Sequence, residues 1–257
     1  MDKGNTGEES CCEIDDGNDQ DTGIYGSGFT GLSDPRVECA ESGRVPVDVT
    51  SNDYYLRCGW NLNNIPFLDG SLLRHVEGDV AGVNVPWLYA GMLFSTFAWH
   101  VEDNYLYSIN YMHTGEGKLW YGVPERDATD FDRCIDTHLH GNTRQERGHM
   151  HRLSTAFSPF VLVKRGVRVF RTIQRPGEFV VTFPRAYHSG FSLGFNVAEA
   201  CNFALPDWLR MGRLAVKHYE KVQRPVCISH DQIVLDVSRA CREFAPVDCA
   251  IIAHETR

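Results

Sequence analysis

The sequence predicts a mostly β domain with helices at both ends, because three patterns coincide in its 257 residues. Two sets of side chains alternate along 105–112, one rich in tyrosine and the other carrying Ser108 and Asn110, as expected for a strand with two different faces. Further strand-like segments lie at 87–92, 118–123, 167–172, 178–182 and 196–203. Helical patterns lie on either side of this block, at 71–76, 208–221 and 230–244.

The remaining elements follow in chain order. Residues 1–20 are polar, acidic and rich in glycine, and this composition predicts a flexible tail. The run His113-Thr114-Gly115-Glu116-Gly117 predicts a hairpin turn between two strands. A helix is expected at 128–139, and the Ser229-x-x-Gln232 pattern is a capping box that begins the last helix. Loops are expected at 30–50 and 142–151.

Composition limits the class of protein. The formal net charge of −9 argues against a nucleic-acid binder that acts through bulk positive charge, and an acidic surface suits a basic partner. The nine cysteines include no C-x-x-C pair, and no apolar run approaches the ~20 residues that a membrane span needs. We therefore expect an intracellular protein with reduced thiols and no membrane segment.

One short motif indicates a metal site. His100 and Glu102 are two residues apart, so on a strand they point to the same side while Val101 points to the other. His188 is the expected third ligand, and two histidines with one carboxylate form the facial triad of non-haem Fe(II) oxygenases. An isolated His-x-Glu also arises by chance, and a single buried histidine is more often a core residue than a ligand.

A second group of residues indicates a site for a small dicarboxylate. Lys118 follows the predicted turn, and Ser108 with Asn110 shares one face of the preceding strand. An ammonium, a hydroxyl and an amide beside a metal could together hold two carboxylates. The alternative, favoured by spacing alone, is that Lys118 is a solvated lysine of the hairpin.

Several ordered motifs resemble one family. The matching segments are 59–64 (GWNLNN), 85–92 (VPWLYAGM), 97–103 (FAWHVED), 107–111 (YSINY), 120–124 (WYGVP) and 177–191. They resemble the JmjC-domain, 2-oxoglutarate-dependent histone lysine demethylases, in particular the JARID-type and plant JmjC branch, over roughly residues 21–224. The resemblance implies a double-stranded β-helix, which is a jelly-roll barrel. It also implies a catalytic domain at 21–224, between a tail at 1–20 and a C-terminal helical segment at 225–257.

The resemblance assigns a role to each site residue. The Fe(II) ligands, which are also the catalytic residues, would be His100, Glu102 and His188. The residues around 2-oxoglutarate would be Phe97, Ser108, Asn110, Lys118, Trp120 and Thr182. The residues at the open side, where O2 and the methylated lysine approach, would be Trp87, Tyr89 and Asn202. From pattern alone, each of the aromatic residues is more often an ordinary core or sheet residue.

The implied function is oxidative removal of methyl groups from a lysine of histone H3, most of all lysine four, with release of formaldehyde, succinate and CO2. Such an enzyme regulates chromatin and transcription in the nucleus, and other domains or subunits would bring it to chromatin. The alternatives are a demethylase for lysine nine or thirty-six, a JmjC protein hydroxylase, or a chromatin scaffold with weak catalysis.

Two residues depart from the family pattern, and the sequence also offers candidate ligands for a second metal. Asp16 stands where the family has a tyrosine that binds the co-substrate carboxylate, which is the best support for a scaffold. Ser192 stands where many relatives carry asparagine. A structural zinc is a lesser alternative, with its candidate ligands at Cys134, His138, His140, Cys227, His230, Cys241 and Cys249.

Overall fold

The computed structural model of the chain describes residues 17–22, 27–29, 52–140 and 157–239. The predicted loops at 30–50 and 142–151, most of the predicted tail, and Asp16 lie outside the described residues. No helix in these ranges is both long enough and apolar enough to cross a membrane.

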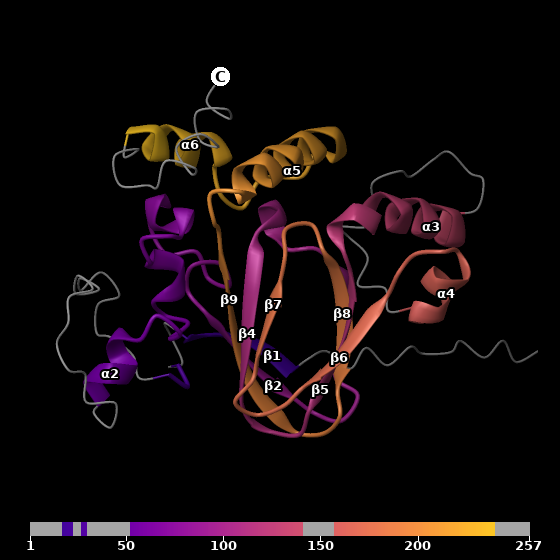
Figure 1. Cartoon of the computed structure of the whole chain (residues 1–257), viewed down its shortest axis with the longest axis horizontal. Coiled ribbons are helices and arrows are strands. Elements are labelled where there is room, and N and C mark those ends of the chain that lie inside the picture. Colours follow the sequence, from indigo (N-terminus) through magenta and orange to yellow (C-terminus); the bar gives the residue numbers. More distant parts are fainter. Residues whose placement is uncertain (1–16, 23–26, 30–51, 141–156, 240–257) are drawn as a thin grey trace, which may run out of the picture.

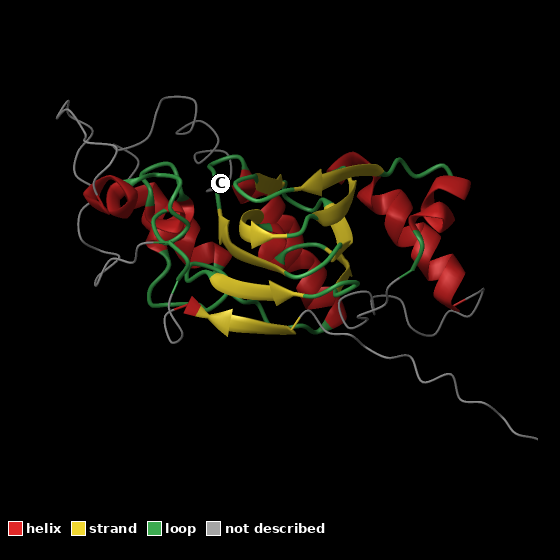
Figure 2. Ribbon diagram, turned by 90° about the horizontal axis from the view of Figure 1, so that it is seen from below, coloured by secondary structure: helices red, strands yellow, loops and turns green. Residues whose placement is uncertain are grey.

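Two antiparallel sheets form the body of the fold, which is mostly β as the sequence predicts. The first has the order β1-β2-β9-β4-β7, with bounds Gly17–Asp21, Trp87–Gly91, Asn196–Phe203, Tyr107–Gly115 and Phe179–Thr182. The second has the order β3-β8-β5-β6, with bounds Thr96–His100, Tyr187–Ser192, Lys118–Val123 and Phe170–Gln174. Seen from below, the strands curve around a shared interior (Figure 2). This is the jelly-roll arrangement expected from the family resemblance.

Helices cover one end and the sides of this barrel. Helices α5 (Trp208–Val222) and α6 (His230–Arg239) lie across one end, and α3 (Ala128–His140) and α4 (Pro159–Lys164) lie to one side (Figure 1). Helix α2 spans Asn52–Arg57. Short 3₁₀ turns are η1 (Ile65–Phe67), η2 (Leu72–His75), η3 (Asp103–Tyr105) and η4 (Glu125–Asp127).

The predicted hairpin at 113–117 is wrong. Strand β4 belongs to the five-stranded sheet and β5 to the four-stranded sheet, so the turn carries the chain from one sheet to the other. Gly115 makes the crossing possible, because its φ is +97° and a Cβ there would lie 2.3 Å from the Phe195 carbonyl oxygen. Glu116 N–H then donates to that same oxygen at 2.8 Å.

Strand β6 starts at Phe170, three residues after the predicted start. The preceding residues have other contacts. Val167 is buried in the cluster beneath α3 and α4, and the Arg168 guanidinium binds the Asp127 carboxylate, with Nε 2.7 Å from Oδ2. The predicted helix at 71–76 is the shorter 3₁₀ turn η2.

The two faces of β4 differ as the alternation predicts. Ser108 and Asn110 occupy one parity and line the barrel interior, with 9% and 7% exposure. Ile109 packs on the other side against Leu62 and Ile65, and Tyr107 packs into the cluster that includes Trp208 of α5. The outer face is therefore covered by helices and turns, which leaves the inner face free to carry polar groups.

The short segment at 27–29 is fixed to β9 by a buried carboxylate. Glu199 has no solvent exposure, and its carboxylate accepts hydrogen bonds from Ser27 Oγ at 2.5 Å and Gly28 N–H at 3.0 Å. His113 Nε2 lies 2.9 Å from the same carboxylate. Gly28 is required at this contact, since a Cβ would lie 2.6 Å from the His113 imidazole.

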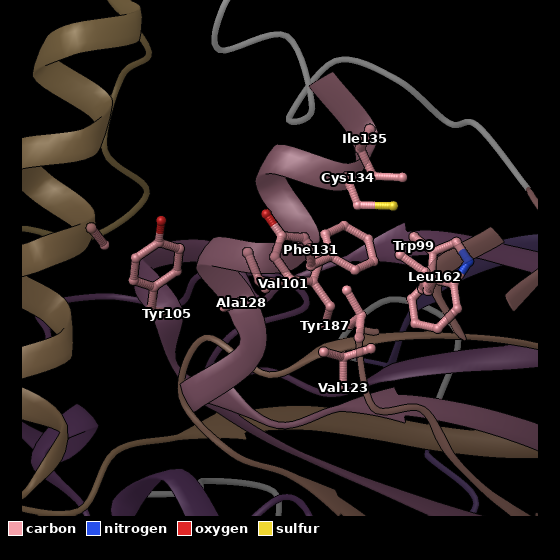
Figure 3. Packing of buried hydrophobic residues seen from close by; sticks show 12 residues of the cluster. Trp99, Val101, Tyr105, Val123, Ala128, Phe131, Cys134, Ile135, Leu162 and Tyr187 are labelled. Atoms are coloured by element: carbon pink, nitrogen blue, oxygen red, sulfur yellow. The ribbon is translucent and has the colours of Figure 1, made fainter. Parts of the chain in front are cut away.

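An aromatic cluster joins α3 to the barrel (Figure 3). The rings of Phe131 and Tyr187 stack with centroids 3.8 Å apart, and Trp99 packs on Phe131 at 5.5 Å. The Tyr187 hydroxyl donates to Asp132 Oδ1 at 2.6 Å. Because Tyr187 directly precedes His188, this cluster fixes the start of β8.

Replacing Phe131 by alanine should lower the free energy of unfolding by about 3–5 kcal/mol, the cost of deleting a fully buried aromatic ring. Urea denaturation measures the change. The control is Asp130→Ala on the exposed side of the same helix, for which we expect a change within about 0.5 kcal/mol. Equal stability of the two variants would contradict the packing described for this cluster.

Candidate metal centre and co-substrate pocket

Three side chains meet at one end of the barrel. Strands β3 and β8 pair antiparallel with His100 opposite His188, and Glu102 lies two residues beyond the end of β3. One ligand atom from each residue lies within 4.8 Å of the others, and among the described residues no other group of three potential ligands does so. Val101 is turned away from them and is buried in the cluster beneath α3.

Both imidazoles are oriented by the same contact. His100 Nδ1 lies 2.8 Å from the Ala98 carbonyl oxygen, and His188 Nδ1 lies 3.0 Å from the Ala186 carbonyl oxygen. Because a carbonyl can only accept, each Nδ1 carries the hydrogen and donates it. In a neutral imidazole the lone pair is then on Nε2, the atom that faces Glu102.

Glu102 supplies a negative charge between the two rings. Its Oε1 lies 3.1 Å from His188 Nε2 and 3.7 Å from His100 Nε2. Burial alone would raise the pKa of Glu102, but contact with the two imidazoles holds that pKa well below its ordinary value. The carboxylate is therefore ionised at neutral pH. Burial also lowers the pKa of His188, which favours its neutral, ligating form.

Asn202 fixes the other carboxylate oxygen. Its Nδ2 donates to Glu102 Oε2 at 2.9 Å and to the Tyr107 carbonyl at 3.0 Å. The hydrogen bond from Asn202 occupies Glu102 Oε2, and Glu102 Oε1 faces the two imidazoles. Two Nε2 lone pairs and an anionic oxygen then face one another, an arrangement that a divalent cation would stabilise. The donor set of two nitrogens and one oxygen fits Fe(II) and related first-row metals.

The candidate zinc ligands do not form a comparable group within the described residues. Cys134 is buried in the cluster beneath α3, and Cys227 is exposed. His230 Nε2 lies 2.8 Å from the Leu209 carbonyl oxygen and serves packing between α5 and α6. The described part of the chain ends before Cys241 and Cys249.

Lys118 is buried in the barrel, with 3% exposure, so the alternative of a solvated hairpin lysine is wrong. Its Nζ lies 5.5 Å from the Phe97 ring centroid and 5.8 Å from the Tyr89 ring centroid. Across the sheet it pairs with Gln174 on one side and with Ser192 on the other. The Phe97 ring that lies near this ammonium also lies 6.3 Å from the His100 ring and 6.4 Å from the His188 ring, between centroids. A buried ammonium at this place in the barrel is well placed to meet an anion.

Polar groups from the opposite sheet face the same interior. Ser108 Oγ and Thr182 Oγ1 are 2.5 Å apart, and the two residues pair directly across β4 and β7. Asn202 is the partner of Ser108 on the other side, on β9. The register of three neighbouring strands thus brings a hydroxyl pair beside the residue that holds Glu102.

Gln174 was not predicted from the sequence, although it connects much of the pocket. It is 1% exposed, and its Nε2 donates to Asn110 Oδ1 at 3.0 Å and to the Asn110 carbonyl at 3.1 Å. Its Oε1 accepts from Trp120 Nε1 at 3.0 Å. Gln174 therefore links β6 to residues of both sheets. No motif marked it, because its partners lie 54 and 64 residues away in sequence.

Aromatic rings form the wall between the pocket and the triad. Phe97 and Trp120 meet edge to face with centroids 4.7 Å apart, and Trp120 stacks toward His188 at 6.1 Å. Tyr89 and Trp87 are partly buried on β2, and the Trp87 indole lies against Gly82. A cavity of about 300 Å³ is lined by residues of β5, β6, β7 and β8 that include Trp120, Thr182 and His188, while Lys118, Ser108 and Asn110 are not in its lining.

Comparison with known proteins gives two family matches. The family described as "JmjC domain, hydroxylase" matches residues 87–203, which include the whole triad. The family described as "Lysine-specific demethylase 5, C-terminal helical domain" matches residues 207–255.

Curated relatives agree with these matches. The chain is 48% identical over 227 residues to lysine-specific demethylase JMJ703 of Oryza sativa subsp. japonica, covering 88% of the chain and 17% of the relative. It is 43% identical over 227 residues to lysine-specific demethylase JMJ17 of Arabidopsis thaliana, covering 88% and 18%. A second Arabidopsis relative, JMJ16, is 47% identical over 223 residues, covering 87% and 18%. The chain thus spans less than a fifth of the length of these relatives.

Replacing Gln174 by leucine keeps the size of the side chain but leaves Trp120 Nε1 and Asn110 Oδ1 without this partner. We expect the free energy of unfolding to fall by about 1–3 kcal/mol for each orphaned group. Urea denaturation measures this. The matched control is Arg175→Ala, the exposed neighbour, whose backbone contact to Glu178 is retained. A Gln174→Leu variant as stable as this control would show that the bridge contributes nothing.

Proposed function

Because the chain belongs to the JmjC-domain family, we propose that it is the catalytic part of an Fe(II)- and 2-oxoglutarate-dependent histone lysine demethylase. The observation that carries the proposal is that His100, Glu102 and His188 converge and that Lys118 is buried in the same four-stranded sheet as the two histidines. Neither feature alone would suffice, since a metal-binding triad serves many reactions and a buried lysine can have a structural role.

In this proposal His100 Nε2, His188 Nε2 and Glu102 Oε1 hold Fe(II) and leave the opposite side open. The bound metal supplies oxidation by O2, coupled to decarboxylation of 2-oxoglutarate. The protein's contribution is to keep both imidazoles in the ligating tautomer through Ala98 and Ala186, and to keep Glu102 ionised.

The co-substrate would enter the interior between the two sheets. Lys118 would bind its distal carboxylate through a charge-assisted hydrogen bond. Asn110, Ser108 and Thr182 would add hydrogen bonds from the facing sheet, and Phe97 and Trp120 would exclude water from the chelating end. Gln174 would position Asn110 and Trp120 without contacting the co-substrate.

The methylated lysine would approach from the side of Trp87 and Tyr89, where aromatic faces favour a methylammonium. Asn202, which already holds Glu102, would border that side. The overall reaction balances: one oxygen atom of O2 enters succinate, and the other enters the methyl group. The resulting hydroxymethyl amine releases formaldehyde and leaves a lysine with one methyl fewer, while 2-oxoglutarate loses CO2.

The substrate we propose is the tail of histone H3, methylated at lysine four, in the nucleus. The relatives are lysine-specific demethylases by name, and the net charge of −9 suits a basic peptide. Other parts of the protein or its partners would bring this unit to chromatin. A protein hydroxylase is the second candidate, since the matched family carries that description.

The first test is turnover on peptides of histone H3 methylated at lysine four, nine or thirty-six, with Fe(II), ascorbate and 2-oxoglutarate, followed by mass spectrometry. We expect stepwise loss of one methylene mass from the lysine-four peptide. Loss confined to lysine nine or thirty-six would keep the chemistry and change the site. A gain of one oxygen mass without demethylation would identify a hydroxylase.

The His188→Ala variant should lose Fe(II) binding and turnover, because only two ligands would remain. Isothermal titration under anaerobic conditions measures metal binding, and peptide turnover is measured in parallel. The control is Lys217→Ala on α5, an exposed residue outside the triad and outside the cavity that His188 lines. Full turnover by His188→Ala would rule out the proposed ligand set.

The Lys118→Met variant should raise the KM for 2-oxoglutarate by about tenfold or more, since a charge-assisted hydrogen bond contributes roughly 1.5–3 kcal/mol. Its KM for the peptide should change much less. Steady-state kinetics with each substrate varied in turn gives both values. An unchanged requirement for 2-oxoglutarate would assign Lys118 to the structure of the barrel and not to binding.

A further inference from the structure

The turn that follows Glu102 has an unusual backbone. Asn104 and Tyr105 are consecutive residues with φ of +52° and +53°, in the left-handed region that non-glycine residues rarely occupy. Such conformations cost free energy and persist only where surrounding contacts fix them. Glu102 is the residue that starts this turn, since its carbonyl accepts from Tyr105 N–H at 3.0 Å.

The contacts that fix the turn come from one part of the chain. Asn104 has no solvent exposure, and each of its four polar groups is bonded to the segment 208–228. Its N–H donates to the Tyr219 hydroxyl at 2.8 Å, and its carbonyl accepts from Trp208 Nε1 at 3.0 Å. Its side-chain Nδ2 donates to the Ile228 carbonyl at 2.9 Å, and its Oδ1 accepts from Cys227 N–H at 3.2 Å.

The neighbouring residue strengthens the connection. Asp103 Oδ1 lies 2.7 Å from the Arg224 guanidinium, and Arg224 also lies over the Tyr219 ring, 5.2 Å from its centroid. The segment 208–228 and the turn 103–105 are therefore joined by five polar contacts within a few residues of Glu102. Helix α5 lies across one end of the barrel (Figure 1). Glu102 lies near that end, because it accepts a hydrogen bond from Asn202, close to the end of β9 that leads into α5.

We propose that Asn104 is a positioning residue, through which the segment 208–228 sets the geometry of Glu102 and thus the affinity of the metal centre. The proposal rests on the metal ligands assigned under the proposed function. Asn104 lies two residues from Glu102 and acts through the backbone: if its hydrogen bonds fail, the left-handed turn relaxes toward ordinary φ values. The carboxylate then leaves the position from which Oε1 faces both imidazoles.

The competing interpretation is that Asn104 only attaches the helices to the barrel. The two differ in what a mutation changes. A positioning role predicts weaker metal binding out of proportion to any loss of stability. A purely structural role predicts that metal binding follows stability, whichever contact of the helical segment is weakened.

Two variants remove single groups from the network. Asn104→Asp keeps the acceptor for Cys227 N–H and replaces the donor to the Ile228 carbonyl by a carboxylate oxygen, which cannot donate to it. Tyr219→Phe deletes the hydroxyl that accepts from Asn104 N–H and keeps the buried ring. The matched control is Ile233→Ala, which leaves a cavity in the core between α6 and η2 but touches no group of Asn104.

The experiment is a titration of the metal-free full chain with Co(II), which reports affinity and ligand geometry through its visible absorption without requiring turnover. Thermal unfolding in chelator gives the stability of each variant. We expect Asn104→Asp to bind Co(II) at least tenfold more weakly with an altered spectrum, and Tyr219→Phe to bind it a few-fold more weakly. Ile233→Ala should have a lower Tm and the affinity and spectrum of the wild type.

Two results would each overturn this inference and leave the proposed function intact. The first is that Asn104→Asp and Tyr219→Phe both fold and bind Co(II) with wild-type affinity. The second is that Ile233→Ala, at the same stability as these two variants, loses as much Co(II) affinity as they do. If Asn104→Asp fails to fold, Tyr219→Phe decides. Absence of Co(II) binding in the wild type, or equal binding by His188→Ala, would remove the metal site itself. The proposed function and the inference would then fall together.

Discussion

The pairing of β3 with β8 is the interaction on which the site depends. It sets His100 opposite His188, and the carbonyl two residues before each histidine fixes the ring by the same Nδ1 contact. At His100 the contact lies within β3, where residues i and i−2 share a face. At His188 the carbonyl belongs to Ala186, the residue directly before β8. Glu102 lies beyond the end of the strand, so sheet hydrogen bonds do not position it. Its carboxylate requires Asn202 from β9, and its backbone requires the turn at 103–105.

The pocket beside the triad depends on contacts between the two sheets. Lys118 and Trp120 belong to the four-stranded sheet, while Ser108, Asn110 and Thr182 belong to the five-stranded sheet. Gln174 joins the two sets, because it accepts a hydrogen bond from Trp120 and donates one to Asn110. A change in the distance between the sheets would break these hydrogen bonds. A small ligand that contacted both sets would be recognised by the distance between the sheets as well as by charge.

The period of two along β4 was sufficient to predict which side chains face the interior, and the i, i+2 spacing was sufficient to choose His100 and Glu102 as candidate ligands. Both are properties of neighbouring residues. The partner of a strand is not such a property, and for this reason β4 and β5 were wrongly joined in a hairpin. The bounds of β5 were predicted correctly, but residues 113–115, predicted as turn, belong to β4. Gln174 and Asn104 were missed for a related reason. Their importance lies in partners 54 to 124 residues away, which the residues around them do not indicate.

The position of β9 in its sheet determines when the barrel can form during synthesis. Strand β9 lies between β2 and β4, yet it is made after both, about 100 residues further along the chain. As the chain leaves the ribosome, β2 and β4 have unpaired edges until residue 203 is available, and Asn104 lacks its partners until residue 228. Folding of this domain consequently waits until residues up to 228 have been made, with slow, non-local strand pairing and a period in which the exposed edges need protection from aggregation.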